Sequence, residues 1–101
     1  MTEGYRAFAN ASEYTFDCPD GVWTGTLDHK AWGKTLNLIL YFTDQDTGAK
    51  YWFSVFNGER YKPRDGSVDF KNEAEPGETF SLTTSHTKTG NPVLQSAQKQ
   101  R

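Results

Sequence analysis

Residues 51–66, YWFSVFNGERYKPRDG, combine large rings with cations at a spacing that suits binding. The first half carries the apolar side chains Tyr51, Trp52, Phe53, Val55 and Phe56, and the second half carries Arg60, Lys62 and Arg64. Proteins that bind single-stranded nucleic acid stack rings on the bases and place cations along the backbone. Aromatic residues and Arg are also enriched at protein interfaces. This stretch therefore predicts a binding surface.

Other rings and cations in the chain extend this candidate surface. The full set of expected binding residues is Trp32, Tyr41, Trp52, Phe56, Lys30, Lys34, Arg60, Lys62, Arg64 and Lys88. Alternation along an extended strand separates Trp52 from its neighbours Tyr51 and Phe53, so Trp52 lies on the opposite face from these two rings. If those two rings point into a core, Trp52 belongs to the outer surface.

Motifs for catalysis or cofactor binding are incomplete. WGKT at 32–35 ends like a phosphate-binding loop, but Asp28 stands where that motif needs its first Gly. DQDTG at 44–48 opens like a calcium loop, yet Val55 stands where the closing Glu is required. His29 and His86 belong to no nucleophile motif, and their irregular spacing from Cys18 does not indicate a zinc site. We expect a protein without catalytic residues, metal or cofactor.

Length and composition indicate one small domain. The chain has 101 residues, a formal net charge of −2 and 15% aromatic residues, so a few large rings supply much of the buried area. We expect a single domain over 1–101, with flexible termini at 1–12 and 97–101. Cys18 is the only cysteine, and the first residues contain no apolar run typical of a signal peptide. These features favour a cytoplasmic protein that does not enter a membrane.

Apolar periodicity predicts strands and no helix of normal length. Alternation is clearest at 34–44 and 50–56, which DQDTGA joins into a hairpin. Further strands are expected at 21–29, 78–86 and 92–97, with Gly25 permitting a bulge or a bend in the first of these. The connection at 58–77 is expected to hold a short extended piece at 67–70 and one helical turn at 71–75.

Five strands in this spacing favour an all-β fold, a small five-stranded antiparallel barrel. The strand pattern resembles that of OB-fold binding modules; an SH3-like barrel and a small β-sandwich are the alternatives. The resemblance implies that the second and third strands present rings, with cations in the loops beside them. The composition is also similar to that of small acidic β-proteins of bacteriophages and mobile elements, which often block a host protein.

Three interpretations account for rings on the outer face of the 34–56 hairpin. The N-terminal segment, with Tyr5, Phe8, Tyr14 and Phe16, or the 58–77 connection covers them as a second core layer. Alternatively, they bind a protein partner or a second copy of the chain. In the third interpretation they stack on single-stranded nucleic acid, although the negative net charge opposes tight binding. Among the binding functions we expect a protein partner or self-association, with nucleic acid as the alternative.

Overall fold

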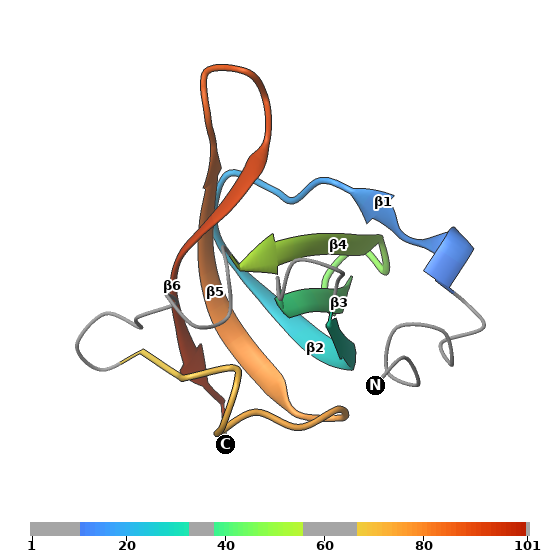
Figure 1. Ribbon diagram of the computed structural model, residues 1–101, viewed down its shortest axis with the longest axis vertical. Helices are drawn as coiled ribbons and strands as arrows, with labels where there is room; N and C mark the ends of the chain where they lie inside the picture. The colour runs from blue at the N-terminus through green and yellow to red at the C-terminus, as the bar shows by residue number, and fades with distance from the viewer. Residues whose placement is uncertain (1–10, 33–37, 56–66, 101) are drawn as a thin grey trace.

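The computed structural model describes residues 11–32, 38–55 and 67–100, which form one mixed β-sheet of six strands (Figure 1). The strands are β1 (Thr15–Phe16), β2 (Gly21–Trp32), β3 (Leu38–Asp44), β4 (Lys50–Val55), β5 (Thr79–His86) and β6 (Pro92–Lys99). Their order across the sheet is β1-β4-β3-β2-β5-β6. A short 3-10 helix, Ala11–Glu13, precedes β1, and the described residues contain no α-helix. The all-β prediction is confirmed.

The five expected strands correspond to β2–β6. Strand β2 is longer than expected and continues to Trp32, while β3 is described from Leu38 onward. Strand β6 runs to Lys99, so residues 97–99, expected in a flexible terminus, pair with β5, and Ala97 is buried. Residues 67–75 contain no strand or helix, but the amide of Glu73 donates to the carbonyl of Asp69 at 2.7 Å, which closes a single turn at 69–73, two residues before the expected one.

The prediction of a closed five-stranded antiparallel barrel, OB-like or SH3-like, is not confirmed. The sheet is not closed, and a sixth strand, β1, pairs in parallel with β4 at Thr15↔Tyr51 and Phe16↔Trp52. A strand of two residues has no alternation to detect, which is why sequence patterns miss it. Strands β4 and β6 approach each other, but no ladder between them is found among the described residues.

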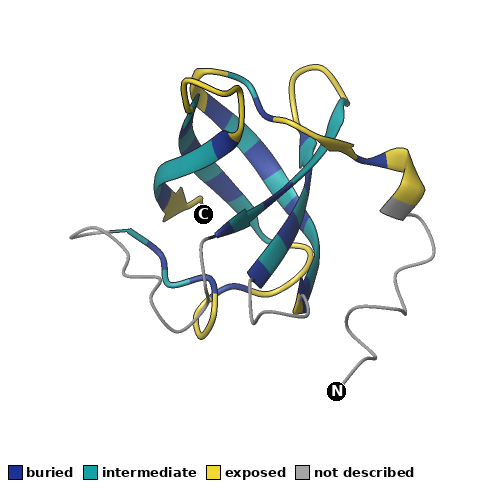
Figure 2. Ribbon diagram, turned by 45° about the horizontal axis from the view of Figure 1, so that its top comes forward, coloured by how far each residue is buried: buried dark blue, intermediate teal, exposed yellow. Residues whose placement is uncertain are grey.

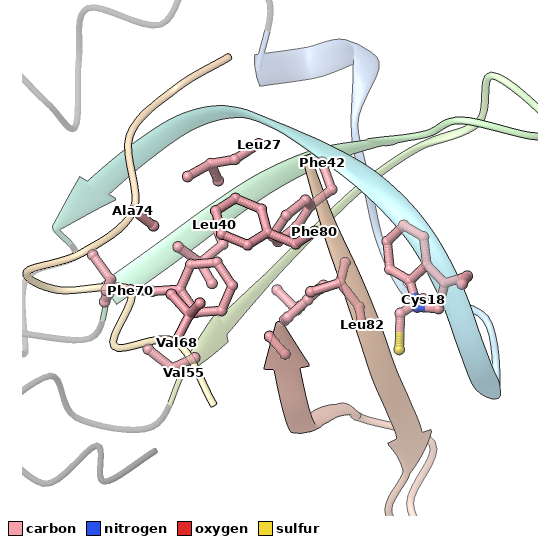
Figure 3. Close-up of a cluster of buried hydrophobic side chains, with 14 residues drawn as sticks. Cys18, Leu27, Leu40, Phe42, Val55, Val68, Phe70, Ala74, Phe80 and Leu82 are labelled. Atoms are coloured by element: carbon pink, nitrogen blue, oxygen red, sulfur yellow. The ribbon is translucent and has the colours of Figure 1, made fainter. Parts of the chain in front are cut away.

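The inner face of the sheet holds the core, where Phe53 is fully buried and Tyr51 packs partly buried, as expected of these two rings. Buried and half-buried residues alternate along β3 and β5 (Figure 2). Phe42, Phe70 and Phe80 meet at the centre, where Phe42 and Phe53 also stack at 5.6 Å (Figure 3). The segment at 67–74 contributes Val68, Phe70 and Ala74 to this core. It is held to β6 by a hydrogen bond from the amide of Val68 to the carbonyl of Ala97, 2.9 Å.

A bulge in β2 decides which side chains face the core. The bulge was expected at Gly25, but it lies between Leu27 and His29, further along the strand. After the bulge, Lys30 is opposite Leu40 and Trp32 is opposite Leu38, so both share the inner side of the sheet with these core residues. His29 is opposite Tyr41 on the outer side.

The loop DQDTGA forms the predicted hairpin turn. The side chain of Asp44 accepts a hydrogen bond from the amide of Asp46, 2.8 Å, and Gly48 has φ of 75°. This turn fixes the register in which Tyr41 is opposite Trp52, and so positions the rings of the outer face.

Candidate functional site

Aromatic side chains from β2, β3 and β4 gather on the outer face of the sheet. Tyr41 and Trp52 are cross-strand neighbours with ring centroids 6.4 Å apart. The His29 ring lies 6.0 Å from that of Tyr41. These three rings, His29, Tyr41 and Trp52, are called the aromatic face below.

Residues 14–20, called the strap, partly cover this face. The Tyr14 ring meets Tyr41 edge-on at 5.2 Å, and the Phe16 ring lies on Trp52 at 4.4 Å. Tyr14 is buried, whereas Phe16 remains 45% exposed. Tyr41 and Trp52 are both half-buried, so the expected cover by the N-terminal segment is present over both rings and is partial. Tyr5 and Phe8 lie outside the described residues.

A polar network anchors Tyr14 to the sheet. The Tyr14 hydroxyl donates a hydrogen bond to Oδ2 of Asp28, 2.7 Å, and the Thr43 hydroxyl donates to the same oxygen. Lys50 donates to Oγ1 of Thr43 at 3.3 Å and lies 5.4 Å from the centre of the Tyr14 ring. Burial raises the pKa of Tyr14, and the Asp28 carboxylate raises this pKa further. Tyr14 is thus a neutral hydrogen-bond donor at physiological pH.

The far end of the strap is tied to β5 by an imidazole between two carboxylates. His86 contacts Asp17 through Nε2 at 2.8 Å and Asp20 through Nδ1 at 2.7 Å, and this trio is called the His86 bridge. Hydrogen bonds to Asp17 and Asp20 raise the pKa of His86, and the hydrogen bond to His86 lowers the pKa of Asp17. Both ring nitrogens face carboxylates, so His86 has no nitrogen directed at a nucleophile as a catalytic triad requires.

Cys18 and Pro19, which lie in sequence between Asp17 and Asp20, attach the strap to the edge of the core. Cys18 is buried, its thiol donates to the carbonyl of Ser85 at 3.8 Å, and burial raises the pKa of the thiol. The carbonyl of Pro19 accepts the hydroxyl of Thr84, which in turn accepts a hydrogen bond from Nε1 of Trp23, 2.7 Å. Residues 18 and 19 are therefore fixed, whereas residues 15 and 16 lie at the exposed edge.

The structure separates the expected binding residues. Tyr41 and Trp52 lie together, but Lys30 is on the other side of the sheet, where its Nζ donates to the carbonyl of Phe70 at 3.0 Å. Trp32 is 37% exposed at the end of β2. Lys88 lies in the β5–β6 turn at the top of Figure 1, next to the opposite end of β2. The remaining members lie outside the described residues: Lys34, Phe56, Arg60, Lys62 and Arg64.

The outer face beyond the rings carries small hydroxyl side chains. Thr24 is opposite Ser81, and the hydroxyls of Thr26 and Thr79 are 3.3 Å apart. Val22, at the start of β2, is 73% exposed. Large rings are thus concentrated toward the β1–β4 side of the sheet.

The His86 bridge was not anticipated from the sequence. His86 is 66 positions from Asp20 and 69 from Asp17, so no local pattern links the imidazole to the two carboxylates. Within the described ranges, no group of three or more His, Cys, Asp or Glu side chains is arranged to hold a metal ion. No helix in the described part of the chain is long and apolar enough to cross a membrane.

Comparisons of the chain with protein-family models, characterised proteins and solved structures found no match. The aromatic face is therefore the feature of the chain from which a function is proposed.

Proposed function

We propose that the protein is a small non-enzymatic binding module whose aromatic face binds a protein partner, either another protein or a second copy of the chain. The supporting observation is the stack of Phe16 on Trp52 at the edge of the sheet, with Phe16 still 45% exposed. Phe16 and Trp52 offer apolar surface to a partner. The short strand β1 lies at the edge of the described sheet, where strands present N–H and C=O groups for pairing. Both are features of protein interfaces.

The charges around the aromatic face favour protein over nucleic acid. The carboxylate of Asp28 accepts a hydrogen bond from Tyr14, and Asp17 and Asp20 belong to the strap itself. Lys50 is engaged with Thr43 and the Tyr14 ring, and Lys30 is directed to the other side of the sheet. The phosphates of a nucleic acid at this face would be repelled by these carboxylates, whereas salt-sensitive binding of a nucleic-acid backbone requires cations.

Single-stranded nucleic acid is the second candidate. Tyr41 and Trp52 are opposed on β3 and β4, the arrangement in which rings of OB-type modules stack on bases. A curved five-stranded sheet such as β2–β6 is compatible with a partly open OB-like barrel. If the protein binds nucleic acid, the cations that contact the phosphates would come from the basic residues after β4, Arg60, Lys62 and Arg64.

One paired experiment separates the candidates. Light scattering measures the mass of the wild type and of Trp52→Glu over a range of concentrations, and the fluorescence of the wild type is titrated with a thymidine oligonucleotide at low and high salt. We expect no salt-sensitive quenching. A mass that rises with concentration, and does so less in Trp52→Glu, would identify a second copy as the partner. Salt-sensitive quenching with a constant monomer mass would contradict the proposal and favour nucleic acid.

A further inference from the structure

We propose that Tyr14, Thr15 and Phe16 occupy in cis a site for an extended peptide that adds to the edge of β4 away from β3. This inference rests on the proposed function and specifies its partner. The ligand class is a segment with two aromatic residues separated by one residue, running parallel to β4. In the structure the chain's own strap takes this position.

The edge of β4 has the geometry of a strand-addition site. Among the described residues, the side of β4 away from β3 is paired at Tyr51 and Trp52, two of the six positions of the strand. Parallel pairing with β1 exchanges main-chain hydrogen bonds that do not depend on the identity of the added segment. Any extended peptide that reaches this edge can make the same bonds.

Side chains on the aromatic face supply the specificity. In an extended segment, residues i and i+2 lie on the same side, so Tyr14 and Phe16 both project over the outer face. The Tyr14 ring contacts Tyr41, and its hydroxyl donates a hydrogen bond to Asp28. The Phe16 ring stacks on Trp52. The site therefore prefers Tyr at the first position, because the carboxylate of Asp28 accepts a hydroxyl there, and accepts any flat ring at the second.

Within the described residues, the main-chain ladder that holds the strap in this site is short. Both residues of β1 are exposed, and a ladder of two pairs is far shorter than the typical strand of about five or six residues. The other restraints seen in the described part of the chain are the Phe16–Trp52 stack, the buried Tyr14 with its hydrogen bond to Asp28 and, beyond β1, the His86 bridge and the Cys18–Pro19 anchor. A peptide that supplies the same rings can replace residues 14–16 while residues 18–20 stay in place.

Fluorescence anisotropy tests this site directly. The probe is a fluorescein-labelled synthetic peptide with the sequence of residues 11–20 and the substitution Cys18→Ser. It is titrated with the full-length wild type and with the full-length double variant Tyr14→Ala, Phe16→Ala, in which the strap competes less. Because the apparent dissociation constant scales inversely with the open fraction, we expect binding to the double variant to be at least about tenfold tighter. Adding Trp52→Ala to the double variant should weaken binding by at least about tenfold.

A matched peptide and a second variant complete the test. A control peptide with Tyr14→Ala and Phe16→Ala should not bind saturably. Circular dichroism verifies that each variant is folded. If the double variant fails to fold, His86→Ala takes its place, since that change loosens the strap and leaves all the rings intact; we then expect a several-fold gain in affinity over the wild type.

Absence of saturable binding to the folded loosened variant would overturn the inference, as would binding that Trp52→Ala leaves unchanged. The proposed function is judged separately, by light scattering. If Trp52→Glu weakens self-association but the peptide does not bind, the strand-addition site is wrong and the binding face stands.

Discussion

Trp52 and Phe53 are neighbours on β4 with opposite environments, and this contrast defines the aromatic face at the scale of single residues. Phe53 is fully buried against Phe42, whereas Trp52 is half-buried under a partly exposed ring. Strand alternation predicts this division from sequence, because it requires no knowledge of strand order. The contacts that each ring makes could not be predicted, since they depend on which segment lies across the sheet.

Matched alanine substitutions measure the difference between the two faces. Phe53→Ala should lower the free energy of unfolding by about 3 to 5 kcal/mol, because it leaves a cavity in the core. Trp52→Ala should lower it by about 1 to 2 kcal/mol, the range usual for a half-buried residue. Urea denaturation of both variants beside the wild type gives the comparison. Equal losses would mean that Trp52 belongs to a second core layer.

Gly25 has a different role from the one that its position in β2 suggests. The sequence predicts that it permits a bulge, but the bulge lies further on, and Gly25 instead leaves room for the Trp23 ring. A Cβ at this position would lie 2.7 Å from Cζ3 of Trp23 and 3.2 Å from Cδ1 of Leu82. The reason for this glycine is tertiary packing, which no local pattern records.

Gly25→Ala should therefore destabilise the fold by overpacking, by about 1 to 3 kcal/mol. Thr24→Ala on the half-exposed face of the same strand is the matched control and should cost less. Both values come from urea melts followed by fluorescence. A neutral Gly25→Ala variant would show that the Trp23 ring can move without loss of packing.

At the scale of elements, the strap is the part that sequence analysis describes least well. The hypothesis that the N-terminal segment covers the rings identified Tyr14 and Phe16, but not that Thr15–Phe16 would pair with β4 as a strand. The bulge in β2 similarly moves Lys30 and Trp32 away from the rings of β3 and β4. A shift of one residue reverses the face of every later side chain of the strand, which is why Lys30 and Trp32 lie on the other side of the sheet from Tyr41 and Trp52.

The His86 bridge makes the strap sensitive to pH. The pKa of His86 is raised in the folded state, so its stabilisation is complete below the unfolded pKa, about 6.5, and is lost as pH rises through the higher folded value. The pKa of Asp17 is lowered, so its stabilisation is present above its unfolded pKa and lost as pH falls through the lowered value. The strap is held most firmly between these limits.

We expect Trp52 to become more accessible to acrylamide as pH rises above the raised pKa of His86. The measurement uses a Trp32→Phe background, because Trp32 is itself exposed. His86→Ala should remove the pH dependence between pH 6 and 9, whereas His29→Gln, which changes the ring beside Tyr41, should retain it. If His86→Ala retains the same profile, another group controls the strap.

At the scale of the whole molecule, the sheet is built around β2, which pairs with β3 along one part and with β5 along the other. The sequence predicts its all-β character and the inward residues of β3–β5 because period-two alternation reports burial directly. It does not predict the open, mixed sheet, because pairing between distant segments is decided by packing across the core. Stability should therefore be uneven, high in β2 and β3 and low at the β1 edge.

Native-state hydrogen exchange tests whether the strap that covers the aromatic face is displaceable, as binding at this face requires. The comparison is made within β4, between amides hydrogen-bonded to β1 and amides hydrogen-bonded to β3. We predict that the amides facing β1 exchange through a local opening that low urea concentrations barely change, while those facing β3 exchange through global unfolding. If both sets exchange with the same free energy and the same dependence on urea, the strap is an integral part of the fold and does not open to admit a partner.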